Sequence, residues 1–376
     1  MKKIMTLAAL AAVVLSSCSK NEIIPNTREE NAVVFGAYSG TTKAAPITST
    51  TILKDQGGFS VFAYYTGSAD FSATATPNFM FNQNVTSTDG TTWTYSPVKY
   101  WPNNDSNTTS GSSTFTDKLS FFAYAPYVAA GADGATSNAV ITHVTANTAT
   151  GDPKVTYAIA ANPANSIDLL YSDADLKNKT KQDYTITSKV TFTFKHALSR
   201  LEFLVQGAFD SITAGDGALD PATKIYVNSV KIQSEGISKT GVLNLNSGAW
   251  ELGAVDASFE PAVNVPDDLK SGGTGVTASE AALHAAGEYF MLFPTASAVN
   301  YNFIIDYDVI TTDTALDGEK SQINNKITKT ASIKFEAGKA YKVKLVLGMT
   351  TVKLDADVAD WTDASDQVIW MPINLS

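Results

Sequence analysis

Apolar and polar residues alternate along several stretches of this chain, and this pattern constrains the fold more than any other feature. The longest stretch spans residues 299–309, where Val299, Tyr301, Phe303, Ile305, Tyr307 and Val309 alternate with Asn300, Asn302, Asp306 and Asp308, and only Ile304 breaks the polar face. Successive side chains of a β-strand point to opposite faces, so this stretch has one buried and one solvated face. The pattern therefore predicts antiparallel sheets packed face to face, with the first set buried and the second exposed.

Other stretches extend this interpretation to most of the chain. Similar alternation marks residues 190–194, 341–347 and 352–358, whereas residues 59–65 and 119–124 are apolar on both faces. The latter two are typical of central strands or of strands covered by loops. The apolar phase slips between residues 227 and 230, which predicts a bulge near Asn228. Crossover helices for a parallel sheet are missing, and we expect one two-turn helix over residues 279–286, with Ser279 as its N-cap.

The N-terminus predicts export and a lipid anchor. Two lysines precede an apolar run over residues 4–15, which suits a signal peptide and is too short to cross a membrane. The run ends in Leu-Ser-Ser-Cys, which resembles a bacterial lipobox, and Cys18 is the only cysteine of the chain. We therefore expect a signal peptide over residues 1–17, lipid on Cys18 and a flexible tether over residues 18–30.

Charge and residue types exclude several classes of function. The chain has 27 Lys and Arg against 37 Asp and Glu, a net charge of −10, which disfavours binding to nucleic acid. One cysteine and three histidines exclude disulfide scaffolds, cysteine zinc sites and iron–sulfur clusters. The glycine-rich residues 273–278 follow no strand, so a loop is favoured over a dinucleotide site. His196 is interpreted as structural rather than as a ligand or base. The sequence predicts no enzyme, no cofactor and no metal site.

Polar stretches divide the chain into two parts. Residues 103–113, 129–152 and 173–184 are polar and loop-like, and strong strand patterns resume after them. We place a domain boundary at residue 187, with an N-terminal domain over residues 31–187 and a C-terminal domain over residues 188–376.

Several short sequences occur in an order that resembles one known family. They are Lys99-Tyr100-Trp101-Pro102, Leu119-Ser120-Phe121-Phe122-Ala123-Tyr124, Lys195-His196-Ala197-Leu198, Gly287-Glu288-Tyr289-Phe290, Phe335-Glu336-Ala337-Gly338-Lys339 and Asp360-Trp361. Together with the lipobox, this order resembles the fimbrillin family of Bacteroidota, the type V pilins and their fimbrillin-like relatives. The resemblance extends from Ala32 to about Trp361.

The resemblance implies an all-β structural protein with two transthyretin-like antiparallel β-sandwich domains. Such proteins travel as lipoproteins to the surface of the outer membrane, where a protease removes an N-terminal segment. The subunits then polymerise with other pilin subunits by strand exchange into adhesive fimbriae, whose receptor the sequence does not identify. Cleavage in this family usually follows an arginine, whereas the best-placed basic residue here is Lys43. Arg28 is the alternative cleavage site.

The residues themselves suggest which strands would exchange. Residues 31–38 read as a short strand that lies just before Lys43, so cleavage there would strip it from its sheet. At the other end, the tail over residues 367–376 places Ile369, Met371, Ile373 and Leu375 on one face. The tail is either the donor strand for a neighbouring subunit or simply the last edge strand of its own chain.

Two other functions remain open at this level. Tyr100 and Trp101 could stack on a sugar, as in a monomeric surface lipoprotein that binds glycan, although a place in the core or as a loop anchor is the favoured interpretation. A surface hydrolase would need acid and base groups clustered in a pocket, and the spacing of the carboxylates does not point to one.

Overall fold

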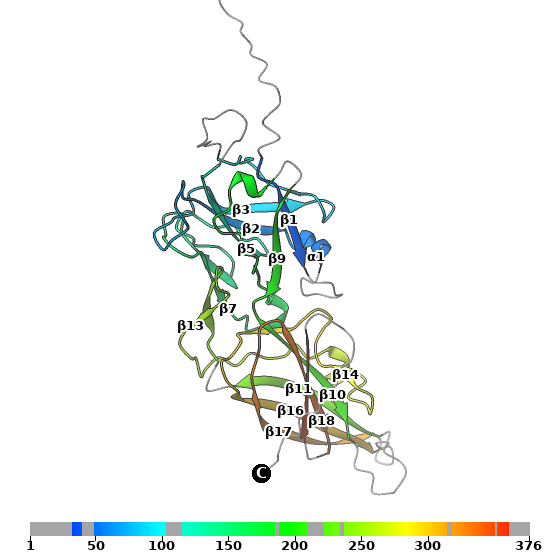
Figure 1. The fold of residues 1–376 in the computed structure, drawn as a ribbon. Helices are drawn as coiled ribbons and strands as arrows, with labels where there is room; N and C mark the ends of the chain where they lie inside the picture. The colour runs from blue at the N-terminus through cyan, green and yellow to red at the C-terminus, as the bar shows by residue number, and fades with distance from the viewer. Residues whose placement is uncertain are drawn as a thin grey trace, which may run out of the picture.

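Nearly all regular structure in this chain is β-strand, and the strands form several sheets along an elongated molecule (Figure 1). The computed structural model describes residues 32–39, 49–102, 115–184, 188–208, 222–233, 237–313, 318–349 and 352–360. The predicted all-β class is confirmed. The two transthyretin-like sandwiches stay a prediction.

The N-terminal end of the molecule is a closed barrel. Its strands, in spatial order, are β1 (Phe35–Ser39), β4 (Trp93–Thr94), β3 (Met80–Ser87), β2 (Phe59–Tyr65), β5 (Leu119–Ala125), β8 (Leu170–Ser172) and β9 (Val190–His196). Neighbouring strands are antiparallel, except that β1 and β9 are parallel. Closure leaves each of these strands with a neighbour on both sides.

Two sheets face each other at the opposite end. One contains β14 (Ala281–Ala282), β10 (Ser199–Gly207), β18 (Lys339–Leu347) and β19 (Val352–Asp360), with β15 (Phe290–Leu292) also paired to β10. The other contains β11 (Thr223–Gln233), β16 (Val299–Asp313) and β17 (Glu319–Ile333). The rings of Phe203 on β10 and Phe303 on β16 meet edge to face at 5.6 Å, so the two sheets share one core.

A fourth sheet joins strands that lie far apart in the sequence. Its order is β13 (Trp250–Leu252), β12 (Thr240–Asn244), β7 (Lys154–Ala158) and β6 (Ile141–Val144). The expected boundary at residue 187 lies outside the described residues. Strands from before and after this boundary pair with each other. In the barrel β9 pairs with β1 and β8, and in the fourth sheet β12 pairs with β7. The division into two domains therefore stays a prediction.

Helix is confined to short segments in the described part of the chain. The segments are α1 (Thr50–Asp55), capped by the Ser49 side chain, and the 3-10 turns η2 (Pro163–Asn165), η3 (Lys181–Asp183) and η4 (Asp267–Leu269). The helix expected over residues 279–286 is wrong, because this segment contains β14. The Leu283 N–H donates to the Phe203 carbonyl at 2.9 Å, so the backbone bonds the edge of β10 rather than its own next turn.

Strands β2 and β5 are buried on both faces, as their apolar sequences predicted. They pair with each other, and alternate side chains point into two different cores. Val61 and Phe121 belong to the core inside the barrel, whereas Phe62 and Tyr124 belong to the larger core that continues into the C-terminal sheets. The two cores thus lie on opposite sides of the same pair of strands.

Strand β16 confirms the predicted alternation at most positions, but Val299, Asn302, Asp306 and Asp308 differ from the prediction. Tyr301, Phe303, Ile305 and Tyr307 are buried, Val299 is half-buried, and the pairing of β11 with β16 shifts between Val227 and Ser229, where a bulge was expected. Asn300 is exposed and Asn302 and Asp306 are half-buried, but Asp308 is only 7% exposed, so its predicted exposure is wrong. Burial alone would raise the pKa of the Asp308 carboxyl. Hydrogen bonds from neighbouring side-chain amides, including the one from Asn324 Nδ2 at 2.9 Å, outweigh burial, so the pKa lies below its ordinary value.

Candidate assembly groove

Strand β1 closes the barrel, and its two neighbours hold it unequally. On one side, β1 runs parallel to β9 through five residue pairs that begin with Phe35 and Val190. On the other side it runs antiparallel to β4, and the pairing of the two strands is between Phe35 and Trp93. The barrel therefore closes through a short seam between β1 and β4. We call the place that β1 occupies, between β9 and β4, the assembly groove.

The side chains of alternate residues fill the assembly groove. Val33, just before β1, is 1% exposed, and Phe35 is fully buried. The Phe35 ring lies 5.1 Å from that of Tyr95, 5.6 Å from that of Phe192 and 6.0 Å from that of Phe121. Burial of an apolar side chain of this size contributes about 1.5–3 kcal/mol, so these residues anchor the strand.

Backbone groups at one end of the groove are held by a tyrosine. The Val33 N–H donates to the Lys99 carbonyl at 2.9 Å, and the Tyr95 hydroxyl donates to the Val33 carbonyl at 2.8 Å. Burial raises the pKa of Tyr95 to about 12, so the hydroxyl keeps its proton at neutral pH. Both bonds go to main-chain groups, which any extended segment can offer.

The outward side of β1 is largely exposed to solvent. Val34 is 37% exposed and Tyr38 is 58% exposed, whereas Gly36 lies against β9. A Cβ atom at Gly36 would lie 3.0 Å from Thr191 Oγ1, which is tighter than an ordinary contact. The outward face thus accepts larger side chains on either side of Gly36 and little at Gly36 itself.

Removal of β1 would uncover the side chains and backbone groups that it now contacts. The floor of the groove would be aromatic, because Tyr95, Phe121 and Phe192 would lose their cover. Its walls would carry the unpaired N–H and C=O groups of β9 and β4, which are costly to leave without partners.

The residues predicted to anchor, process and exchange the chain lie outside the described residues. They are Cys18, Arg28, Lys43, Ile369, Met371, Ile373 and Leu375. Described elements flank them: β1 ends at Ser39, α1 begins at Thr50 and β19 ends at Asp360. The expected strand at residues 31–38 is present as β1, which starts at Phe35, with Ala32 forming an isolated bridge to Tyr100.

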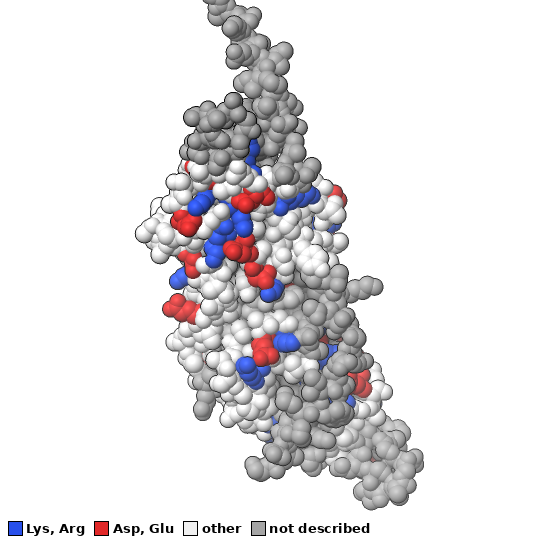
Figure 2. Space-filling view, viewed as in Figure 1, with Lys and Arg blue, Asp and Glu red and all other residues white. Residues whose placement is uncertain are grey.

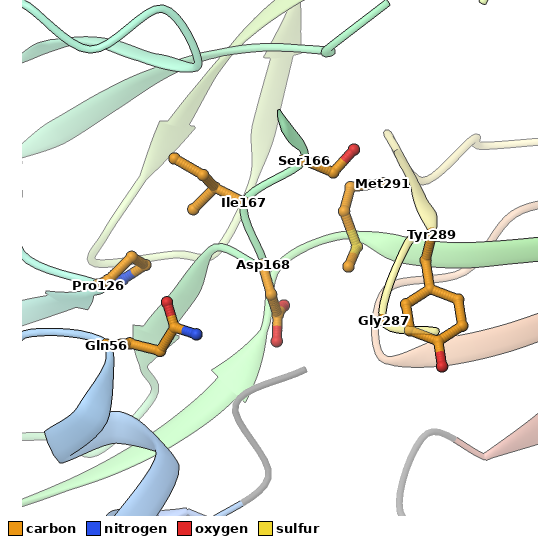
Figure 3. A pocket seen from close by; sticks show the side chains of 8 residues that line it. All are labelled: Gln56, Pro126, Ser166, Ile167, Asp168, Gly287, Tyr289 and Met291. Atoms are coloured by element: carbon orange, nitrogen blue, oxygen red, sulfur yellow. The ribbon is translucent and has the colours of Figure 1, made fainter. Parts of the chain in front are cut away.

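A small hollow lies where the barrel meets the C-terminal sheets (Figure 3). Its volume is about 70 Å³, and the residues that line it are Gln56, Pro126, Ser166, Ile167, Asp168, Gly287, Tyr289 and Met291. The Nδ1 atom of His196 lies 3.0 Å from Asp168 Oδ1, which agrees with a structural histidine.

The two aromatic residues considered for sugar binding differ, because Trp101 is buried and Tyr100 is exposed. Trp101 is 6% exposed and stacks on Tyr184 with 4.9 Å between ring centroids and an interplanar angle of 21°. In the hollow, the Arg200 guanidinium lies 4.5 Å from the centroid of the Tyr289 ring and covers one face. Trp101 is therefore part of the core, as the favoured interpretation had it.

Charges of both signs are interspersed on the face of the barrel that Figure 2 shows, with uncharged surface between them.

The described residues contain no group of three or more His, Cys, Asp or Glu side chains arranged to hold a metal ion. Among the helices of the same residues, none is long and apolar enough to cross a membrane.

Two parts of the groove escaped the sequence analysis. Alternation reveals which face of a strand is buried but not which strand lies beside it, so the parallel pairing of β1 with β9 was not foreseen. Tyr95 was also missed, because a tyrosine in a turn-rich segment carries no periodic signal. The apolar pattern of residues 190–194 identified the strand itself.

A family model described as fimbrillin-like matches residues 41–361 of this chain. The match covers the barrel from α1 onward and all of the C-terminal sheets.

Two individual proteins are similar over nearly the whole chain. The fimbrium subunit Fim1C of Phocaeicola vulgatus is 25% identical over 401 residues, which cover 96% of this chain and 97% of that protein. The crystal structure of a fimbrial protein from Bacteroides vulgatus, with 25% identity, superposes with a TM-score of 0.66 over 88% of this chain and all of that one.

Proposed function

This chain belongs to the fimbrillin-like family, and from that premise we propose that it assembles by exchanging β1 for the tail of another subunit. The chain is a structural subunit of a fimbria at the cell surface, and its partners are other fimbrial subunits. Exchange begins when a protease hydrolyses the peptide bond between Lys43 and Ala44. Arg28 is the alternative site, but cleavage there would leave β1 attached.

The observation that carries this proposal is the position of β1 in the barrel. The strand ends at Ser39, four residues before Lys43, so a cut at Lys43 leaves it without a covalent link to the rest of the domain. It is then held by the pairs with β9 and β4 and by the buried Val33 and Phe35 side chains. These contacts are non-covalent, and an incoming strand of similar pattern can replace every one of them.

The empty groove would be unstable, and this drives the second half of the exchange. Loss of the buried Val33 and Phe35 side chains removes about 1.5–3 kcal/mol of burial free energy for each of them. It also leaves backbone groups unpaired. The tail of a second copy, with Ile369, Met371, Ile373 and Leu375 on one face, offers the alternating apolar residues that the groove needs. Each subunit that accepts a tail also presents its own, so the reaction forms a linear polymer.

Cleavage at Lys43 is tested with a pair of matched variants. We expect Lys43→Ala to prevent removal of the N-terminal segment, because the protease loses its basic residue, whereas Arg28→Ala leaves processing unchanged. The N-terminal residue of surface-extracted protein, determined by sequencing, identifies the site. Normal processing of Lys43→Ala together with blocked processing of Arg28→Ala would assign the cut to Arg28 and exclude this route to an open groove.

We further propose that Cys18 carries the lipid that brings the chain to the outer membrane before processing. Insertion of an acyl chain into the bilayer contributes about 0.8 kcal/mol of binding free energy per buried CH₂. Cys18 is the only cysteine of the chain, so its replacement removes this attachment. Cys18→Ala is therefore expected to move the unprocessed chain from the membrane pellet to the soluble fraction, with Ser19→Ala in the tether as a control that stays in the pellet. Equal membrane association of both variants would contradict lipidation at Cys18.

A further inference from the structure

Gly36 restricts how a tail can lie in the assembly groove. Its outward side faces Thr191, where even a Cβ atom would lie 3.0 Å from Oγ1. The backbone groups of the residue at this place also bond to β9. The Val190 N–H donates to the Val34 carbonyl at 2.8 Å, and in a parallel ladder every second residue of a strand bonds to the same neighbour, so Gly36 does as Val34 does. A large side chain is therefore unfavourable at the place of Gly36, and so is a proline, which lacks the N–H that the ladder needs.

The tail can fill the inward places of Val33, Phe35 and Ala37 in four ways. Either Ile369, Met371 and Ile373 or Met371, Ile373 and Leu375 enter, and each set can run parallel or antiparallel to β9. Three of these placements put Pro372 or Trp370 at the place of Gly36. The fourth runs parallel to β9, as β1 does, and puts Asn374 there. Its Cβ meets the same contact with the Thr191 side chain, but asparagine is smaller than tryptophan and, unlike proline, retains its N–H.

The fourth placement also suits the proline. Pro372 then takes the place of Val34, one residue before the ladder between β1 and β9 begins at Phe35 and Val190. The carbonyl at this place is needed, because the Val190 N–H bonds to it, and proline retains its carbonyl.

An exposed aromatic residue finds a partner in the same placement. Trp370 takes the place of Ala32, which forms an antiparallel bridge with Tyr100. Side chains directly opposite each other in such a pair lie on the same face, and Tyr100 is 42% exposed in the free subunit. Trp370 would thus cover Tyr100 with a cross-strand aromatic contact.

We infer that the tail of a second copy enters the assembly groove parallel to β9, with Met371, Ile373 and Leu375 at the places of Val33, Phe35 and Ala37. Trp370 pairs with Tyr100. This inference rests on the proposed strand exchange and adds the direction and the register of the donor.

A disulfide between subunits tests the register directly. Ala32 and Tyr100 form a non-hydrogen-bonded pair, since the Val33 N–H donates to the Lys99 carbonyl. The Cα atoms of such a pair are about 4.5 Å apart, which a disulfide can span. Full-length chains carrying Tyr100→Cys and Trp370→Cys are expected to form a ladder of covalent oligomers on non-reducing gels of boiled material, and reductant should abolish it. Cys18 is absent from the processed subunits, so only the introduced cysteines can react.

Each alternative placement would bring a different residue opposite Tyr100. The matched controls combine Tyr100→Cys with Val368→Cys, Asn374→Cys or Ser376→Cys, and we expect at least tenfold less covalent ladder from each of them. A ladder that is strongest with one of these three would overturn the register and identify the true one. Absence of heavy species before boiling in the chain without introduced cysteines would instead overturn strand exchange itself, and the register with it.

Discussion

A chain that ends at Gln367 is expected to fold, reach the cell surface and be processed, yet form no species heavier than the monomer. The deletion of residues 368–376 removes the apolar face of the tail and leaves β1 to β19 intact. Cleavage then opens a groove that no neighbour can fill, so assembly stops rather than weakens. Native gels of surface-extracted material without boiling measure this, since assembled fimbriae give a ladder and the truncated chain should give one band.

Point variants separate the donor face from mere loss of length. Ile373→Asp puts a charge into the apolar place of Phe35, where its desolvation is costly, and should abolish the ladder. Ser376→Asp puts its charge at the exposed place of Tyr38 and should leave most of the ladder in place. A ladder from the truncated chain, or equal ladders from the two point variants, would contradict the tail as donor.

Phe303→Ala is expected to destabilise the protein by about 3–5 kcal/mol, the range for truncating a buried phenylalanine. The side chain is fully buried and lies at the contact between the two C-terminal sheets, where its ring meets that of Phe203 at 5.6 Å. Collapse of the cavity is opposed on both flanks, because β16 is hydrogen-bonded to β11 and to β17. Urea unfolding followed by far-UV circular dichroism gives the free energy of unfolding.

The matched control for this variant lies three residues away on the same strand. Asn300 is exposed, so Asn300→Ala should change the free energy of unfolding by at most about 0.5 kcal/mol. A loss below about 1 kcal/mol for Phe303→Ala, close to that of the control, would contradict a shared core between the two sheets.

The sequence alone predicted the face of each strand better than its neighbours. Alternation identified Phe303 and Tyr301 as buried, and the phase slip identified the bulge beside Asn228, because both signals depend on nearby residues. Asp308 was assigned to solvent by the same rule, which does not register that Asn324 on β17 reaches over it. The pattern of a strand does not indicate which distant strand it pairs with, so the pairing of β1 with β9 could not be predicted.

The error at residues 279–286 has a similar origin. The segment is alanine-rich and begins with a serine, so local propensity favoured a helix. The free edge of β10 offered its backbone groups to Ala281 and Ala282, and tertiary pairing outweighed propensity. The sequence predicted an apolar groove under the removable strand but not the aromatic residues that line it, since these lie up to 157 positions from Phe35, as with Phe192.

The pairing of β1 with β9 also sets an order in time. Residues 35–39 are made before β9, which begins at residue 190, and the tail is made last. Every strand of the barrel therefore precedes the tail in the chain. Under the proposed exchange, a subunit stays capped by its own β1 until the protease acts, so cleavage decides when it can polymerise.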